Sequence, residues 1–247
     1  MDYKINSYSC LVHKIKIDTV DPIIVCDDAN IRLNLTASHV FVVPSNQRGT
    51  VTLLVTEKVQ SNIQVYCAEN VDVTIRLIVL FPETADITLS SMMCGDSSNV
   101  TILGMCALAD RQSVKIQTTQ IHCGKQGQSK IVLQGLINDN AIVKYDGTIR
   151  IEKDACGTYA LQNNKNILLS STAAAVSIPN IEVLNHDVQC FHGAAIGKFE
   201  LQQMHYMQSR GLSELIIKQL LVQELFAQVL QGYEEKEFVL QKVYEKI

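Results

Sequence analysis

Several features that would place a chain in a functional class are missing from this one. No apolar run approaches the ~20 residues that a membrane-spanning helix needs. The first ten residues, MDYKINSYSC, contain no basic stretch followed by an apolar one, so no signal peptide is evident. A formal net charge of −4 argues against a general nucleic-acid binder. We therefore expect a cytoplasmic protein with no nucleic-acid or membrane partner.

Closely spaced cysteine pairs are also missing. None of the eight cysteines forms a C-x-x-C pair, and in an unexported chain we expect reduced thiols, not disulfides. For His122-Cys123, whose side chains face opposite ways on a strand, we expect a core cysteine beside a surface or hydrogen-bonded histidine. Six other cysteines are predicted to be small buried side chains: Cys10, Cys26, Cys67, Cys94, Cys106 and Cys156.

Motifs of the common enzyme classes are absent as well. Gly124-Lys125 lacks the upstream glycine of a phosphate-binding loop and is followed by Gln126, so no nucleotide site is predicted. The run from Gly95 to Asn99 fails the nucleophile-elbow pattern at its last position. No pair of carboxylates has a context typical of glycosidases. We expect a non-enzymatic protein, with a hydrolase built on a β-helix as an open alternative.

Short apolar strands at a regular spacing fill the middle of the chain. With 247 residues, 47% of them hydrophobic, the chain can bury the core of one elongated domain. Turn-forming clusters such as Asn138-Asp139-Asn140 separate the strands. A spacing of about 13 residues per strand fits a β-solenoid, although a β-sandwich is also compatible. The predicted strands begin near Val51, Ile63, Asp72, Ile87, Asn99, Ser113, Lys130 and Ala141.

Helical periodicity begins after Lys198. Gly211 is expected to end one helix and Ser213 to cap the next, with Gly232 as its stop. Such amphipathic stripes are expected either to pack on the β-region or to bind a partner, and we weigh the two equally. The apolar positions are Ile216, Leu220, Leu221, Leu225 and Val229 in one stripe, and Val239, Val243 and Ile247 in a second.

A candidate ligand pair lies in the segment from Asn185 to Gly197. Cys190 and His192 are two positions apart, so on a strand they share one face about 7 Å apart. Thiolate and imidazole are ligands for iron–sulfur clusters, zinc and copper. His186 has the same parity and is a weaker candidate ligand. The alternative is a buried cysteine beside a hydrogen-bonded histidine.

A longer series of residues carries a resemblance to a known family. In order and spacing, the segment from His122 to about Val229 resembles the core domain of SufB and SufD, paired proteins of the SUF iron–sulfur assembly machinery. The residues before about 120 share only the texture of short strands. The matching residues are His122, Gly135-Leu136-Ile137, Ala141, Asp146-Gly147, Gln162-Asn163-Asn164, Leu168-Leu169, Pro179, Ile181-Glu182-Val183, Asp187-Val188, Cys190, His192-Gly193-Ala194, Tyr206 and Ser209-Arg210-Gly211.

The resemblance implies a fold and favours one branch of the family. It implies a mainly β protein, a right-handed parallel β-helix over residues 1–197 (1–45 as leading strands), followed by a C-terminal helical segment over 198–247. The chain is similar to SufD, because the functional cysteine that SufB carries before the Leu168-Leu169 pair is absent and Gly193 follows the late histidine. Family members are usually longer, with an N-terminal helical domain that this chain is expected to lack.

The resemblance also implies a role and partners. Cys190 and His192 would bind a transient iron–sulfur cluster at an interface with a SufB-like paralogue, or with a second copy of this chain, through the β-helix. A SufC-like ABC-type ATPase would dock on the C-terminal helices, for which the candidate contacts are Arg210, Leu221 and Leu225. The chain itself would be a scaffold subunit that binds no nucleotide. The alternatives are a minimal homodimeric scaffold and a metal-independent β-solenoid interaction protein.

Overall fold

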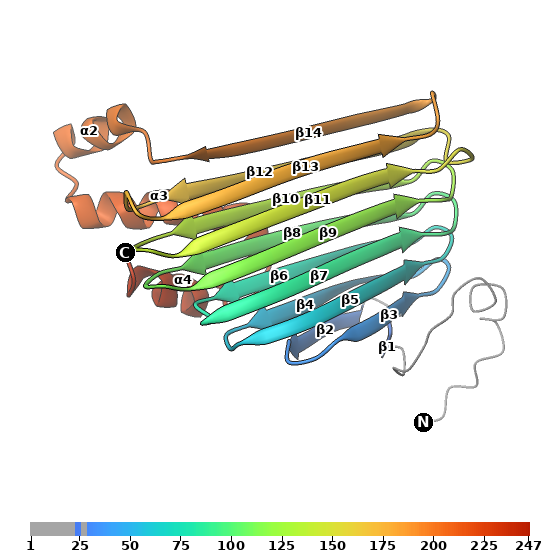
Figure 1. Cartoon of the computed structure of the whole chain (residues 1–247), viewed down its shortest axis with the longest axis horizontal. Helices are drawn as coiled ribbons and strands as arrows, with labels where there is room; N and C mark the ends of the chain where they lie inside the picture. The colour runs from blue at the N-terminus through green and yellow to red at the C-terminus, as the bar shows by residue number, and fades with distance from the viewer. Residues whose placement is uncertain (1–22, 26–28) are drawn as a thin grey trace.

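The computed structural model describes residues 23–25 and 29–247, so the predictions for Cys10 and Cys26 lie outside the described residues. Within these residues, the strands form two seven-stranded sheets (Figure 1). One sheet holds β1 (Ile23–Ile24), β3 (His39–Val43), β5 (Val59–Cys67), β7 (Thr84–Met93), β9 (Ser113–His122), β11 (Ile142–Ile151) and β13 (Ala174–Val183). The other holds β2 (Ala29–Asn34), β4 (Arg48–Val55), β6 (Asp72–Leu80), β8 (Asn99–Leu108), β10 (Gln128–Ile137), β12 (Thr158–Leu168) and β14 (Val188–Gly197).

The chain alternates between the two sheets at every turn. Each strand pairs in parallel with the strand two places along the chain, so that Asn99 of β8 lies opposite Asp72 of β6 on one side and Gln128 of β10 on the other. Every pairing among the described strands is parallel, which confirms the predicted parallel β-helix and excludes an antiparallel sandwich.

Alternating side chains fill the space between the sheets. Along β7, buried and half-buried residues alternate over all ten positions, as the period of a strand requires. The inward residues form one continuous cluster through the length of the solenoid. Its fully buried members include Leu53, Ile63, Ile87, Ile102 and Ile131.

Three helices follow β14: α2 (Leu201–Ser209), α3 (Glu214–Leu230) and α4 (Lys236–Tyr244). Ser213 caps α3 as predicted, because its Oγ accepts a hydrogen bond from the Ile216 backbone nitrogen at 3.4 Å. Gly232, with φ of +69°, takes the left-handed conformation just after α3 that glycine adopts without strain. Among the described residues, no helix is both long enough and apolar enough to cross a membrane.

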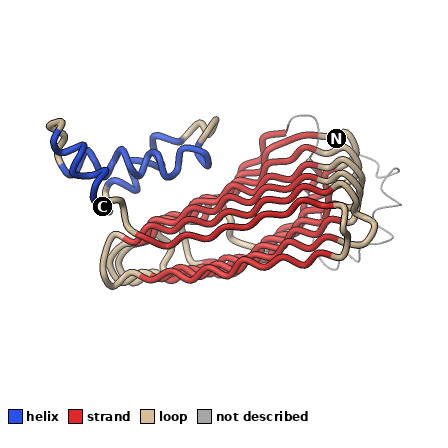
Figure 2. The backbone as a smooth tube through the Cα atoms, turned by 90° about the horizontal axis from the view of Figure 1, so that it is seen from above, coloured by secondary structure: helices blue, strands red, loops and turns tan. Residues whose placement is uncertain are grey.

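The helical segment packs on the outer face of the even-numbered sheet (Figure 2). Val222 and Phe226 of α3 are fully buried there. They belong to a second apolar cluster, which also holds Ile78 of β6, Met105 of β8 and Val132 of β10. The same strands therefore support apolar packing on both of their faces.

The structure bears out only part of the expectation for His122 and Cys123. His122 is fully buried, with its Nε2 atom 2.8 Å from Ser129 Oγ, whereas Cys123 is half-buried. His122 lies in register with Met93 and Ile151, which are both buried. The side chain of His122, and not that of Cys123, therefore points into the core. The predicted hydrogen-bonded histidine is confirmed, and the predicted core cysteine beside it is wrong.

The burial of the other described cysteines depends on whether they lie within a strand or in a turn. Cys67 and Cys106 are buried as predicted, and burial raises the pKa of both thiols. Cys94 follows the last residue of β7 and Cys156 precedes β12, and both are only half-buried. The prediction of a core position is therefore wrong for these two, because turns between strands leave side chains partly outside the core.

Burial of His122 predicts a loss of stability in mild acid. Burial lowers its pKa to about 4, whereas an unfolded histidine titrates near ~6.5. The neutral form is therefore favoured by folding, and its contribution is complete above pH ~6.5 and lost as the pH falls towards about 4. We expect the free energy of unfolding to drop by roughly 2 kcal/mol between pH 7 and pH 5 from this group.

Urea unfolding at the two pH values measures this effect. His122→Gln keeps a polar partner for Ser129 and should remove the drop, whereas His205→Gln, on exposed α2, should retain it. An unchanged pH dependence in His122→Gln would assign the acid sensitivity to other groups.

Candidate functional site

The last coil of the solenoid ends in unpaired strands. Among the described strands, β14 pairs only with β12, and β13 only with β11, so both form sheet edges (Figure 1). No further coil of the described chain covers their inward faces. Side chains that would be buried in an inner coil are consequently accessible here.

Cys190 and His192 lie together on the inward face of this edge strand. Cys190 is opposite Ala160 of β12 and His192 is opposite Gln162, and both of these partners are fully buried. The predicted shared face is confirmed. Cys190 is half-buried against the main core cluster, whereas His192 is exposed.

The surroundings of the two side chains set their chemistry. Partial burial raises the pKa of the Cys190 thiol, so a metal that binds there must displace a proton. The site offers one sulfur and one imidazole, a soft donor set that suits iron–sulfur chemistry. Among the described residues, no three His, Cys, Asp or Glu side chains are grouped to hold a metal ion.

His186 occupies a different environment. It is exposed in the turn between β13 and β14, outside either strand. The strand parity that predicted a shared face therefore does not extend to it. The structure leaves Cys190 and His192 as a pair, without His186 as a third grouped ligand.

Exposed apolar side chains surround the last coil, a feature that the sequence analysis did not select. Phe191 is 51% exposed on the outward face of β14, and its ring centroid lies 5.9 Å from that of Tyr159 on β12. Val176 and Ile178 are exposed on β13. Apolar side chains at an unpaired sheet edge are typical of a surface that pairs with another chain.

The predicted partner residues on α3 are not on the surface. Leu221 and Leu225 are only 4% and 5% exposed, and Leu225 belongs to the second apolar cluster on the even-numbered sheet. Neither side chain is therefore accessible for direct contact with a partner in this structure. The exposed apolar residues of α3 are Leu215, Ile216 and Leu220.

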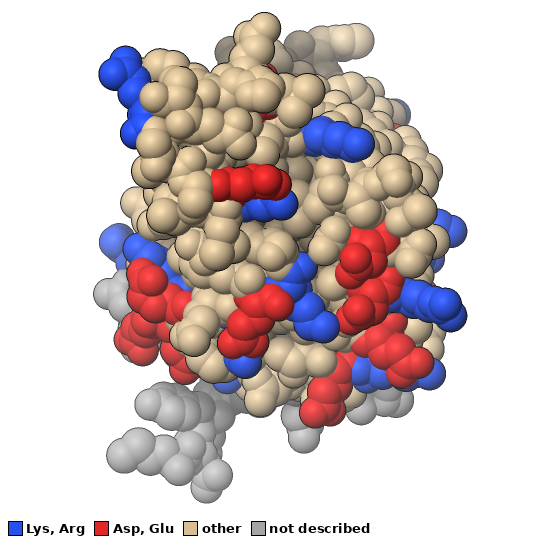
Figure 3. All heavy atoms as spheres, turned by 90° about the vertical axis from the view of Figure 1, so that its left-hand side faces the viewer, with Lys and Arg blue, Asp and Glu red and all other residues tan. Residues whose placement is uncertain are grey.

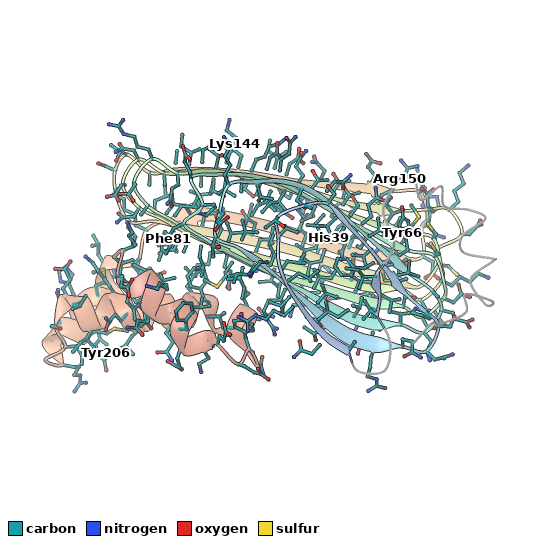
Figure 4. All side chains as sticks on the ribbon, turned by 90° about the horizontal axis from the view of Figure 1, so that it is seen from below. His39, Tyr66, Phe81, Lys144, Arg150 and Tyr206 are labelled. Atoms are coloured by element: carbon teal, nitrogen blue, oxygen red, sulfur yellow. The ribbon has the colours of Figure 1, made fainter. Side chains whose placement is uncertain are left out.

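The exposed part of the helical segment continues onto α2, which buries no residue. Leu201 and Tyr206 are exposed there, and Figure 4 shows Tyr206 at the outer end of the segment. Arg210 is exposed, with its guanidinium carbon 5.2 Å from the centre of the Tyr206 ring. In Figure 3 the charged side chains of this end gather in the lower half, while the upper half is mostly uncharged. We call the five residues Leu201, Tyr206, Leu215, Ile216 and Leu220 the helical apolar patch.

Comparison with known proteins matches most of the chain to one family. Residues 47–225 match a family model described as "SUF system FeS cluster assembly, SufBD core domain". An iron–sulfur cluster assembly SufBD family protein of Mycobacterium tuberculosis is 26% identical over 145 residues, which cover 56% of this chain and 36% of that protein. The iron–sulfur cluster assembly protein SufD of Escherichia coli strain K12 is 22% identical over 161 residues, covering 64% of this chain and 38% of that protein.

A plant relative matches over a shorter stretch. Protein ABCI7, chloroplastic, of Arabidopsis thaliana is 31% identical over 93 residues, which cover 38% of this chain and 20% of that protein. The chain thus spans well under half the length of these relatives.

Proposed function

The chain belongs to the SUF-system iron–sulfur cluster assembly family with a SufBD core domain, and from that premise we propose that it is a SufD-like, non-enzymatic scaffold subunit. It helps form a nascent cluster at an interface with a SufB-like partner. The observation that carries the proposal is the pair of Cys190 and His192 on the inward face of an unpaired edge strand.

A cluster that must be passed to another protein is released most easily when each subunit supplies only a few of its ligands. The cluster is the cargo of this reaction, and donors from one subunit bind only part of it. The remaining ligands come from the partner, so opening the interface releases the cluster without breaking a four-cysteine site in one chain. Cys190 supplies a thiolate, and His192 supplies an imidazole or orients the thiolate of the partner.

The partner meets the last coil of the β-helix. The free edges of β13 and β14 offer backbone hydrogen-bonding groups, and Phe191 and Ile178 add apolar surface beside them. A second copy of this chain presents the same edges, so a homodimeric scaffold is the alternative occupant. In either case the exposed face of His192 becomes covered.

A SufC-like ABC-type ATPase docks on the helical apolar patch in this proposal. The patch holds five of the six large apolar side chains that are exposed on the helices of the described chain. ATP hydrolysis belongs to that partner, and the scaffold transmits the resulting movement to the interface. The assembly acts in the cytoplasm.

The test is metal retention by the assembled complex. The chain is co-expressed without oxygen with a SufB-like and a SufC-like protein, and iron and sulfide are measured after purification. His192→Ala should lower the retained iron and sulfide several-fold, with less than about 0.5 kcal/mol change in stability because the side chain is exposed. Cys190→Ser should have a milder effect, since the partner can supply the essential thiolate.

His205→Ala on α2 removes an exposed histidine outside the site and serves as the matched control. Normal iron loading by a complex carrying both His192→Ala and Cys190→Ser would remove the site from this chain. A complex that assembles but never retains iron would favour a metal-independent interaction protein.

A further inference from the structure

A chain of buried polar side chains crosses the interior of the solenoid beneath the last coil. Thr118 Oγ1 and the Tyr145 hydroxyl are 2.8 Å apart, and Gln162 Nε2 donates to that hydroxyl at 3.1 Å. All three side chains are at most 2% exposed. The chain begins on β9, passes through β11 and ends at Gln162 on β12.

The orientation of the Gln162 amide is fixed by its surroundings. Its Nε2 atom also donates to the Gly147 carbonyl at 3.2 Å, an acceptor that the amide oxygen could not face without repulsion. Glycine at position 147 makes this approach possible, because a Cβ atom there would lie 2.2 Å from Nε2. The amide oxygen of Gln162 therefore points away from β11.

That oxygen has no hydrogen-bond donor among the described residues, although it is fully buried. A buried acceptor without a donor costs about 1–3 kcal/mol, so each such atom requires an explanation. The sheet neighbours of Gln162 are Ile131 on β10 and His192 on β14. The isoleucine side chain carries no donor, whereas the imidazole of His192 carries an N–H group.

We infer that Gln162 is a positioning residue for His192, whose imidazole N–H donates to the buried Gln162 oxygen. His192 is exposed and its imidazole forms no hydrogen bond with the described residues, so it is able to rotate towards its in-register neighbour. Neighbouring parallel strands are about 4.8 Å apart, a separation that these two side chains span easily.

This hydrogen bond would determine which imidazole nitrogen of His192 is free to act as a ligand. A hydrogen bond to one ring nitrogen fixes the tautomer and leaves the lone pair of the other nitrogen as the ligand. The polar chain through Tyr145 and Thr118 holds Gln162, and Gln162 in turn holds His192. This deepens, and rests on, the proposed role of His192 as a cluster ligand, since a ligand must present its lone pair towards the interface.

Nuclear magnetic resonance of the full chain tests the inference without any metal. Long-range proton–nitrogen spectra of ¹⁵N-histidine-labelled protein report the tautomer of each ring, and the His192 signals are identified by their loss in His192→Ala. We expect the His192 tautomer ratio to differ by about tenfold from that of exposed His205, because one hydrogen bond stabilises one form. Gln162→Met, which is similar in volume, should return the ratio to the His205 value.

Two further variants complete the design. Ser177→Ala removes an unpartnered buried oxygen of β13, in the last coil, and should leave the His192 tautomer unchanged. Gln162→Leu removes the same oxygen with a different side chain and should likewise return the His192 ratio to the His205 value. It serves as the second variant if Gln162→Met does not fold.

The outcomes distinguish the positioning of His192 by Gln162 from the proposed role of His192 as a cluster ligand. A His192 tautomer ratio that equals that of His205 in the wild type, or that survives Gln162→Met, overturns the inference. A ratio that depends on Gln162 supports it even if complexes with His192→Ala retain iron normally. In that case the ligand role proposed for His192 fails while its positioning by Gln162 stands.

Discussion

Replacing Ile216 and Leu220 with Asp is expected to abolish co-purification of a SufC-like ATPase while leaving the β-helix folded. The two side chains are 44% and 43% exposed in the helical apolar patch, so charges there remain solvated in the free chain. In the complex the same carboxylates would be buried without partners, which costs several kcal/mol. Affinity purification of the tagged chain from co-expressing cells measures the effect.

Two comparisons give this experiment its specificity. Gln228→Asp adds a carboxylate at an exposed position of α3 outside the patch and should leave binding intact. Leu221→Asp with Leu225→Asp should instead disrupt the packing of the helical segment, because both leucines are buried and Leu225 packs in the cluster between the helices and the sheet. If the Ile216 and Leu220 variant still binds the ATPase, the docking surface lies elsewhere on the chain.

Replacing Arg76 with Met should destabilise the attachment of the helical segment by about 3–5 kcal/mol, from two hydrogen bonds of a charged donor. Arg76 Nε donates to the Val229 carbonyl at 2.8 Å and Nη2 to the Gln231 carbonyl at 2.9 Å, at the end of α3. Burial lowers the pKa of Arg76, and these carbonyls offset the loss of water around its charge. The Tyr233 ring lies against the same guanidinium, 5.5 Å from its carbon.

Hydrogen exchange of the α3 and α4 amides, compared with those of β8, measures the attachment. In the Arg76→Met protein the helix amides should exchange faster while those of β8 keep their protection. Arg150→Met is the control, because that arginine bonds Glu152 and Glu182 on the outer surface, away from the helices (Figure 4). Unchanged helix protection in Arg76→Met would show that the apolar contacts hold the segment without it.

Much of the solenoid could be predicted because its strands repeat a simple pattern. Three predicted strand starts, Asp72, Asn99 and Ser113, coincide with the observed ones. The others differ by up to four residues, as at Val59, where Ile63 was predicted. Hydrophobic alternation identifies the middle of a strand well. The ends of a strand depend on hydrogen bonds between the turns of neighbouring coils, and these cannot be predicted from the sequence of one strand.

The errors have a common physical origin. The stripe predicted on α3 combined Ile216 and Leu220, which are exposed, with Leu221 and Leu225, which are buried. The observed buried face also includes Ile217, Val222, Phe226 and Leu230, whose spacing was visible in the sequence. Because nearly every position of this helix is apolar or long, the pattern alone did not determine which side faces the sheet.

The candidate site was partly predictable for a similar reason. Spacing placed Cys190 and His192 on one face, and the structure confirms it. The position of Gln162 beneath His192 depends on the register between strands 30 residues apart. No local pattern in the sequence specifies that register, so the polar support of the site became visible only with the fold.

The attachment of α3 to β6 sets an order of events when the chain is made. The strands are synthesised before the helices, and each new coil can stack on the one before it as it emerges. Arg76 emerges early, with β6, yet its carbonyl partners at Val229 and Gln231 follow more than 150 residues later. During that interval Ile78, Met105 and Val132 remain an uncovered apolar surface. We therefore expect a chain truncated after β14 to aggregate more readily than the full chain, because this apolar surface would stay uncovered.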